Sequence, residues 1–191
     1  MKHLGTAILE TPRLSLRRFT VADAPAMYRN WASDPEVTKF LTWPVHVSPE
    51  ATAELLTDWV KQYEKLDYYT WAIVLKESGD EPIGSIGVNE YDEKIGKVKI
   101  GYCMGKAWWH RGLMAEALQA VIDYLFGQVE FNRIEAVHDV NNPNSGAVMR
   151  KCGMTYEGTL REYLWNNQGI CDTSMHSILL REWRETHGGH E

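Results

Sequence analysis

Cysteine is scarce in this sequence, and long apolar runs are missing. Only Cys103, Cys152 and Cys171 occur among 191 residues, and no two of them form a C-x-x-C pair. An odd number of cysteines at wide spacing argues against a disulfide scaffold and against a zinc cluster. No apolar run approaches the ~20 residues that a membrane span needs, and the first residues lack the apolar stretch of a signal peptide. We therefore expect a soluble, cytoplasmic protein that binds no metal.

Two nucleotide-binding motifs and an excess of basic residues are also missing. The chain contains neither the Gly-x-x-x-x-Gly-Lys-Ser/Thr loop nor the Gly-x-Gly-x-x-Gly fingerprint. Lys and Arg number 20 against 26 Asp and Glu, so the formal net charge is −6. This negative charge disfavours general binding to nucleic acid and leaves a cationic partner or substrate open.

What is present suits one folded domain. Apolar residues make up 44% and charged residues 24% of the chain, a composition that excludes disorder. The length fits a single domain, and the sequence shows no repeat, low-complexity tract or linker. We expect one domain over 1–191, with its core at about 11–183.

Hydrophobic periodicity predicts seven strands and four helices. The predicted strands cover 13–17, 70–76, 83–88, 98–104, 133–140, 156–165 and 171–180. The first predicted helix begins at Thr20 and ends before Asp34-Pro35. The other three predicted helices cover 48–63, 112–129 and 145–151. Polar segments at 91–96 and 166–169 predict hairpins. This order indicates a mixed α/β protein around one central sheet.

The junction between the predicted strand 98–104 and the predicted helix 112–129 is the first candidate site. A basic and aromatic turn precedes a helix that begins at Gly112, and Arg111 stands beside that glycine. Helix N-termini carry unpaired N–H groups and partial positive charge, and a glycine lets a phosphate approach the backbone. The junction is therefore a candidate pyrophosphate cradle, although similar junctions in many proteins bind nothing.

Two stretches around this junction resemble a known family. The segment 109–117 resembles the pyrophosphate loop of the GCN5-related N-acetyltransferases, in the branch that acetylates ribosomal protein N-termini. Gly112, Glu116 and Ala117 agree with that loop, whereas His110 and Met114 stand where small residues are usual. The stretch 142–154 resembles the branch's Asn-x-x-Ser-x-x-Val-Met-x-Lys-x-Gly-Phe signature. The resemblance extends over nearly the whole chain.

The resemblance implies a fold and a cofactor. The implied fold is α/β (α+β), a single domain with about four helices and a mostly antiparallel seven-stranded sheet that splays between two parallel strands. The implied cofactor is acetyl-CoA, with its pantetheine arm in the splay and its sulfur near Ser145. The residues that would contact it are Tyr102, Met104, Arg111, Gly112, Leu113, Met114, Ala115, Asn142 and Ser145.

Two departures from the family pattern bear on proton transfer. Lys99 stands where many relatives carry a glutamate, and Met149 stands where a tyrosine can serve as an acid. Ser145 then becomes the best acid or thiolate stabiliser, although it could equally be a helix-capping serine. Tyr163 is a second catalytic candidate, with a surface role as its alternative. His138 and His176 are more typical of structural histidines than of a proton relay.

The acceptor is expected to be an amine. At pH 7 the free-energy cost of deprotonating a lysine amine with a pKa of ~10.4 is about 4.6 kcal/mol. For an α-amine with a pKa of ~7.7–8.0 the cost is about 1 kcal/mol. With no strong base in view, an α-amine such as a protein N-terminus is favoured. In this family acceptor pockets are built from the first helices and the last hairpin, which contain Trp31, Trp43, Trp165 and Asp172.

Other interpretations stay open. A small cationic amine such as a polyamine or an aminoglycoside is an alternative acceptor. A CoA-binding regulatory module without turnover is favoured by Lys99 and Met149, and a purely structural or partner-binding domain is a third reading. The chain could be a monomer or a homodimer. Of the other tryptophans, we expect Trp59 and Trp71 in the core and Trp108 and Trp109 beside the loop.

Overall fold

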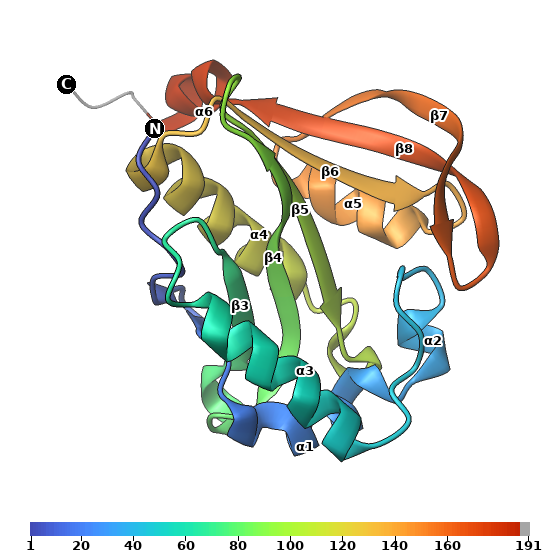
Figure 1. Cartoon of the computed structure of the whole chain (residues 1–191). Helices are drawn as coiled ribbons and strands as arrows, with labels where there is room; N and C mark the ends of the chain where they lie inside the picture. The colour runs from blue at the N-terminus through green and yellow to red at the C-terminus, as the bar shows by residue number, and fades with distance from the viewer. Residues whose placement is uncertain (188–191) are drawn as a thin grey trace.

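The structure, a computed structural model, describes residues 1–187 and is built on one eight-stranded sheet (Figure 1). Its strands lie side by side in the order β1-β2-β3-β4-β5-β6-β8-β7. Their bounds are β1 (Leu9–Glu10), β2 (Leu14–Arg17), β3 (Thr70–Leu75), β4 (Pro82–Asp92), β5 (Lys97–Met104), β6 (Arg133–Asp139), β7 (Thr155–Asn166) and β8 (Gly169–Leu179).

All neighbouring strands pair antiparallel except β5 and β6, which are parallel. The predicted mixed, mostly antiparallel sheet with one parallel pair is therefore confirmed. The predicted number of seven strands is wrong by one. The additional strand, β1, makes only two backbone pairings with β2, and two residues are too few for an alternating pattern to be visible in the sequence.

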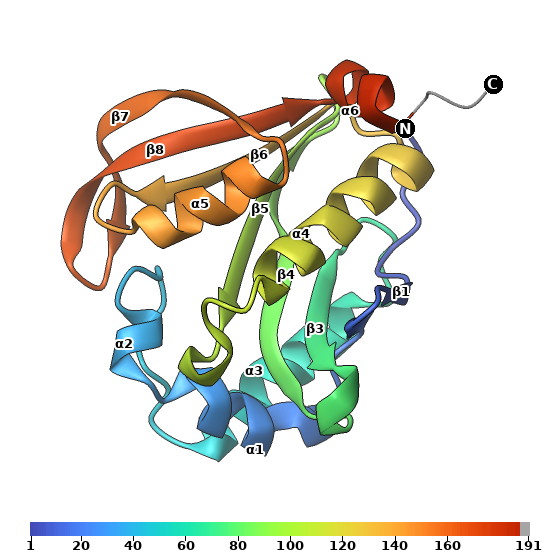
Figure 2. The same cartoon turned by 180° about the vertical axis from the view of Figure 1, so that it is seen from behind.

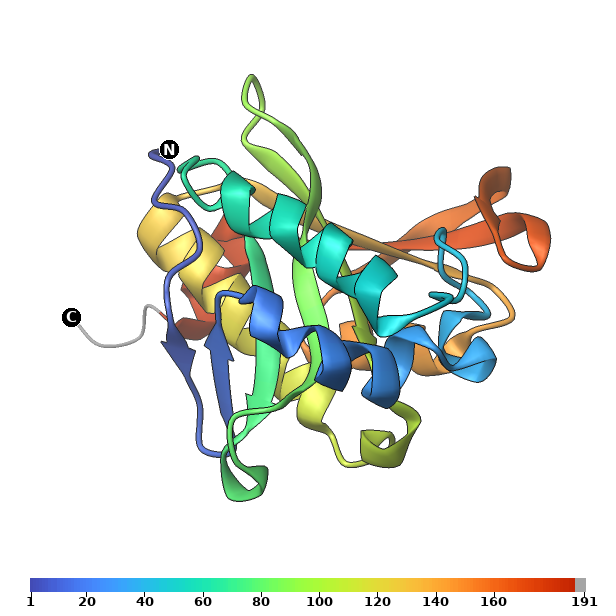
Figure 3. The ribbon, with the colours of Figure 1, turned by 60° about the horizontal axis from the view of Figure 1, so that its bottom comes forward.

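Within residues 1–187, six α-helices surround the sheet. Their bounds are α1 (Ala24–Met27), α2 (Pro35–Thr38), α3 (Pro49–Gln62), α4 (Leu113–Tyr124), α5 (Pro143–Lys151) and α6 (Leu180–His187). Figure 2 shows α4 and α5 on one face of the sheet, and Figure 3 shows α1 and α3 on the other. None of the helices between residues 1 and 187 is long and apolar enough to cross a bilayer.

The two helices missing from the prediction, α2 and α6, depend on local caps and tertiary contacts. Asp34-Pro35 was expected only to end the first helix, but Asp34 also accepts a hydrogen bond from the Glu36 N–H at 2.8 Å and so begins α2. In α6, Trp183 packs on Phe126 and donates its indole N–H to Asp123 at 2.7 Å. Such contacts with a distant helix leave no local signature in the sequence.

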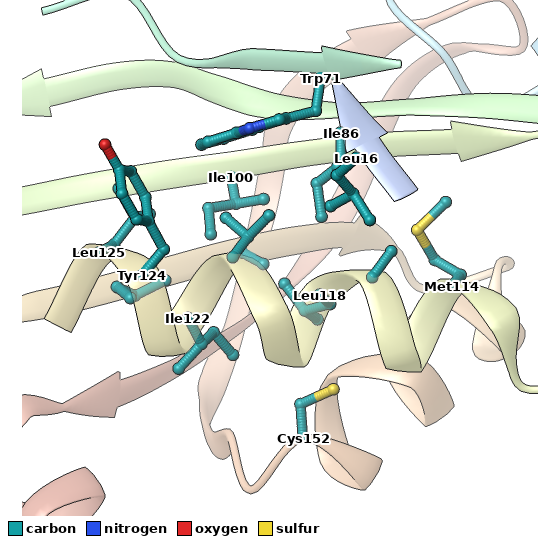
Figure 4. Packing of buried hydrophobic residues seen from close by; sticks show 14 of the residues in the cluster. Leu16, Trp71, Ile86, Ile100, Met114, Leu118, Ile122, Tyr124, Leu125 and Cys152 are labelled. Carbon is teal, nitrogen blue, oxygen red and sulfur yellow. The ribbon is translucent and has the colours of Figure 1, made fainter. Parts of the chain in front are cut away.

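The main core lies between the sheet and α4, as Figure 4 shows for Trp71, Ile100 and Leu118. The hydrophobic periodicity that predicts the helix at 112–129 is confirmed, because the apolar side chains of its stripe are at most 8% exposed: Met114, Leu118, Val121, Ile122 and Leu125. Alternation along β3 divides the apolar side chains between the two faces. Trp71 packs on the α4 side and Ala72 on the side of α1 and α3, where a second cluster is centred on Trp31 and Leu56.

Candidate active site

The parallel strands β5 and β6 separate part of the way along their length. Their pairing runs from Lys97 opposite Arg133 to Ile100 opposite Ala136 and then stops, although β5 continues to Met104 and β6 to Asp139. On their outer sides, β5 stays paired with β4 and β6 with β8. The backbone edge of residues 101–104 that faces β6 is therefore left without a strand partner.

A cavity of about 460 Å³ occupies this opening. The two splayed strands and the start of α5 line one side of it with Tyr102, Cys103, Val137, His138, Asn142 and Ser145. Trp59, the loop after α2 and the end of the β7–β8 hairpin line its other side, with Phe40, Leu41, Trp43, Leu164, Trp165 and Asn166. Segments separated by more than a hundred residues thus meet around one space.

The loop before α4 has the geometry of an anion cradle. Gly112 is the N-cap of α4 and has a left-handed φ of 74°. The N–H groups of Leu113, Met114 and Ala115 form the first turn, where intrahelical acceptors are lacking. Met114, which departs from the usual small residue, is 8% exposed and packs in the core. Its side chain therefore points away from the cradle and does not fill it.

Basic side chains gather close to Gly112. A Cβ added at this glycine would lie 3.3 Å from Lys151 Nζ and 3.7 Å from Arg13 Nη2. A larger residue would therefore intrude on the space that these cations share. Arg111, the predicted phosphate contact, instead reaches Glu77 at 2.9 Å on the surface. The structure thus adds Arg13 and Lys151 to the residues that face the cradle.

Glu116 fixes the first turn of α4 to the start of β2. Its carboxylate accepts hydrogen bonds from the Thr11 hydroxyl at 2.6 Å, the Arg13 N–H at 2.9 Å and Arg13 Nε at 2.7 Å. Arg13 also donates to the Arg111 carbonyl at 3.0 Å. Burial acts to raise the pKa of Glu116, but these hydrogen bonds outweigh it and hold the pKa below its ordinary 4.5.

We expect Glu116→Gln to lower the free energy of unfolding at pH 7 by about 1–3 kcal/mol, because an amide cannot accept all three charge-assisted hydrogen bonds. A lowered folded-state pKa adds stability above the unfolded value and loses it as the pH falls through the folded value. The difference between wild type and variant should therefore shrink below the ordinary pKa of 4.5. Urea unfolding at pH 7 and at about pH 3.5 measures this.

Glu54→Gln is the control for that prediction, because Glu54 is an exposed carboxylate on α3. It should leave the unfolding free energy unchanged at both pH values. A difference for Glu116→Gln that is equally large at both pH values would contradict the ionic role of this carboxylate.

Tyr102 and Ser145 meet across the opening between β5 and α5. The Tyr102 hydroxyl donates to the Ser145 carbonyl at 3.0 Å and lies 3.1 Å from Ser145 Oγ. Burial raises the pKa of Tyr102, so the phenol keeps its proton at neutral pH. Asn142, at the N-cap of α5, lines the same part of the cavity. The pairing of Tyr102 with Ser145 adds a proton donor that the sequence analysis did not identify.

The wall formed by β4 and β5 holds one ion pair and one thiol. Lys99 Nζ lies 2.7 Å from Glu90 Oε1, and the two residues are direct partners in the sheet. A carboxylate therefore reaches the cavity from the neighbouring strand, opposite the position where many relatives carry it. Cys103 Sγ lies 3.3 Å from Ser85 Oγ, and burial raises the pKa of this thiol to about 11.

Trp43 and Trp165, two of the predicted acceptor residues, line the cavity. Trp31 does not, because it is fully buried in the cluster between α1, α3 and the sheet. Its place among the acceptor contacts is a correction, and the reason is packing: its helix turns this side chain inward against Phe19. Trp59, expected in the core, packs against that cluster and also lines the cavity.

Tyr163 and Asp172 lie outside the lining of the cavity. Both are near a bulge in the β7–β8 pairing, where the register shifts between Leu160 and Leu164. Asp172 accepts a hydrogen bond from the Glu162 N–H at 2.9 Å, and Tyr163 is 45% exposed. The assignment of Asp172 to the acceptor site and of Tyr163 to catalysis therefore stays a prediction.

The two histidines belong to different environments. His138 lines the cavity, and its Nδ1 lies 2.8 Å from the Asp139 carbonyl, so Nδ1 carries the hydrogen because a carbonyl can only accept. His176 is 1% exposed, neither of its ring nitrogens has a hydrogen-bond partner among residues 1–187, and burial lowers its pKa. A neutral, structural His176 agrees with this environment.

No group of three or more His, Cys, Asp or Glu side chains within residues 1–187 is arranged to hold a metal ion.

Comparison with known proteins agrees with this geometry. Residues 13–155 match the family model described as acetyltransferase (GNAT) domain. The chain is 34% identical over 179 residues to N-acetyltransferase p20 of Bacillus licheniformis, covering 92% of this chain and 97% of that protein. It is 26% identical over 140 residues to the ribosomal-protein-serine acetyltransferase of Escherichia coli, covering 73% and 77%.

A solved structure has the same fold. RimL, a ribosomal L7/L12 alpha-N-protein acetyltransferase solved in complex with coenzyme A, is similar at a TM-score of 0.81 and 21% identity, covering 92% of this chain and 99% of that chain.

Proposed function

Because this chain belongs to the GNAT acetyltransferase family and is an acyltransferase, we propose that it transfers the acetyl group of acetyl-CoA directly to the α-amine of a peptide or protein. The observation that carries the proposal is the cavity itself. The cavity contains an unpaired strand edge and a serine–tyrosine pair. Aromatic side chains line the side from which an amine can enter. The N-terminus of α4, capped by Gly112, follows β5 after a short loop.

Residues of this chain can be assigned to each part of the cofactor. The N–H groups of Leu113, Met114 and Ala115 would bind the pyrophosphate, with Lys151 and Arg13 balancing its charge. The open edge of residues 101–104 would bind the pantetheine arm, with Asn142 opposite. The Met104 carbonyl already accepts the Trp109 indole N–H at 2.7 Å, and its second lone pair can still accept from the pantetheine arm.

Ser145 and Tyr102 are suited to the departure of the thiol. Bound acetyl-CoA supplies a thioester carbonyl, and its sulfur must gain a proton when the amide bond forms. Tyr102 holds its proton and lies 3.1 Å from Ser145 Oγ. Ser145 Oγ can therefore donate to the sulfur when the Tyr102 O–H turns from the Ser145 carbonyl to Oγ and donates there, and the proton that the attacking amine loses then returns to Tyr102. Two hydroxyls in series replace the tyrosine that other members carry at the position of Met149.

The cavity thiols support direct transfer to the amine. With a pKa of about 11, Cys103 is a thiolate about once in 10⁴ at pH 7, and burial likewise raises the pKa of Cys171. A thiol is a weak nucleophile until it loses its proton. An acetyl-enzyme formed on either cysteine is therefore disfavoured.

The charges of the cavity favour an acceptor with one amine over a polycation. Its lining contains two carboxylates. Glu90 is paired with Lys99, and Asp139 is 6% exposed and accepts hydrogen bonds from Asn141 and Asn166. A polyamine or an aminoglycoside would need several unpaired carboxylates. An α-amine carried on an apolar body suits the aromatic lining better, and its lower pKa requires no strong base.

The test is to mix the protein with acetyl-CoA and a panel of amines and to follow the release of free thiol. The panel contains peptides with free N-termini, Nα-acetylated peptides with one lysine, spermidine and an aminoglycoside. We expect kcat/KM for the free N-termini to exceed that for the lysine peptides by at least about tenfold, given their amine pKa values.

Preference for lysine or for a polycation would refute the α-amine assignment. Thermal stabilisation by CoA without thiol release from any amine would indicate a CoA-binding module instead. A cytoplasmic location and the choice between monomer and homodimer stay predictions.

A further inference from the structure

The turn of the β7–β8 hairpin lies beside the loop that follows α2, as Figures 1 and 2 show. Asn167, in that turn, donates its backbone N–H to the Leu41 carbonyl at 3.2 Å. Its side-chain Nδ2 donates to the Thr38 carbonyl at 2.8 Å and to the Trp43 carbonyl at 2.8 Å. Within residues 1–187, every hydrogen bond between this loop and the hairpin comes from Asn167.

The turn is itself anchored to the splayed strand. Asn166, which is 3% exposed, donates to Asp139 Oδ2 at 2.7 Å and accepts the Gln168 N–H at 2.7 Å. Asp139 ends β6 and accepts the Asn142 N–H on its own carbonyl at 2.8 Å. A continuous set of hydrogen bonds therefore joins the start of α5, the end of β6, the hairpin turn and the loop after α2.

The hairpin needs this anchor because its outer strand has little other support. β7 is the edge strand of the sheet, and most of its residues are exposed. The bulge between Leu160 and Leu164 bends it, with Glu162 in a left-handed φ of 49°. Apart from the bond of Asn166 to β6, few buried contacts hold its end, so the hydrogen bonds of Asn167 decide how that end is joined to the loop after α2.

Two walls of the cavity are thereby joined. Leu41 and Trp43 lie on the loop side, Leu164 and Trp165 lie on the hairpin side, and all four line the cavity. We call the space between them the acceptor slot. Its aromatic and aliphatic walls are opposite the Tyr102–Ser145 side, so an amine that reaches the thioester passes between them.

We infer that Asn167 is a positioning residue that keeps the two walls of the acceptor slot together and thereby sets the affinity and selectivity for the acceptor. This inference rests on the proposed function. Asn167 touches no reacting atom. It fixes the distance between the two walls, so that the N-terminus of an extended peptide contacts both of them. Without it the walls separate, the competent arrangement is less populated and the apparent affinity for the acceptor falls.

The experiment compares Asn167→Ala and Asn167→Asp with Gln168→Ala, a control in the same turn whose side chain is exposed and bonds only the Asn167 carbonyl. Asn167→Asp keeps the size of the side chain but turns a carboxylate toward two carbonyls. Amide hydrogen exchange of residues 38–46 is measured by mass spectrometry without any substrate. We expect exchange about tenfold faster or more in both Asn167 variants and unchanged in Gln168→Ala.

Steady-state kinetics then separate a role in acceptor binding from a general structural role. With the best peptide of the panel, KM for the acceptor should rise about tenfold in both Asn167 variants while KM for acetyl-CoA stays within about twofold. Unchanged exchange at 38–46 would refute the inference that Asn167 holds the two walls together, and an equal rise of both KM values would refute its role in acceptor selection. A wild-type enzyme that acetylates no amine would refute the proposed function, whereas the exchange measurement would still decide whether Asn167 holds the walls together.

Discussion

Tyr102→Phe is expected to lower kcat by about 10²-fold, because it removes the hydroxyl that donates to Ser145 and with it the proton donated toward the leaving sulfur. Ser145→Ala should have an effect of the same size. Since the phenylalanine ring keeps the packing of β5, KM for acetyl-CoA should stay within about threefold of wild type. The two hydroxyls are 3.1 Å apart, so the double variant should be about as slow as either single one.

Tyr124→Phe is the matched control. Tyr124 is also a buried tyrosine whose hydroxyl bonds a carbonyl, that of Gly5 at 2.7 Å, on the far side of the core from the cavity. Its loss should cost about 1 kcal/mol of stability and leave kcat unchanged. Independent, multiplying effects of Tyr102→Phe and Ser145→Ala would contradict their action as one unit, and an unchanged kcat in both would remove them from the proton transfer.

Gly112→Ala is expected to weaken CoA binding by about 5–30-fold, the equivalent of the ~1–2 kcal/mol that a left-handed conformation costs a residue with a Cβ. Gly112 has a φ of 74°, and relieving the strain would turn the first N–H groups of α4 away from the pyrophosphate. The new methyl group would also lie 3.3 Å from Lys151 Nζ. Isothermal titration with CoA measures the loss without requiring an acceptor.

Gly96→Ala provides the comparison, because Gly96 has a φ of 64° and a Cβ added there would also meet its nearest atoms at 3.3 Å. It lies in the turn between β4 and β5, at the other end of β5 from the cradle. The variant should lose a similar amount of stability but bind CoA within about twofold of wild type. Equal CoA affinity in both variants would mean that the loop before α4 does not hold the pyrophosphate.

Most elements could be predicted because their signals are local. Ser48 and Pro49 predicted the start of α3, and Ser48 Oγ accepts the Ala51 N–H at 3.2 Å as a cap should. The apolar stripe of α4 and the turn at residues 166–169 could also be predicted, since periodicity and turn chemistry act within a few residues. The strand β1 and the helix α6 were missed, because pairing with β2 and the packing of Trp183 on α4 and the segment that follows it stabilise them.

The candidate site divides in the same way. By itself the sequence determined the order of the elements, the glycine at the start of α4 and the segments that would surround a cofactor, because these depend on spacing along one stretch of chain. Only the tertiary structure decided that Trp31 is buried while Trp59 lines the cavity, that Glu90 faces Lys99, and that Tyr102 meets Ser145. Those outcomes depend on side-chain direction and on sheet register between residues distant in the chain. A one-residue change of the β4–β5 register, for example, would separate Glu90 from Lys99. Asn167 belongs to this second group, since its three acceptors lie more than a hundred residues away.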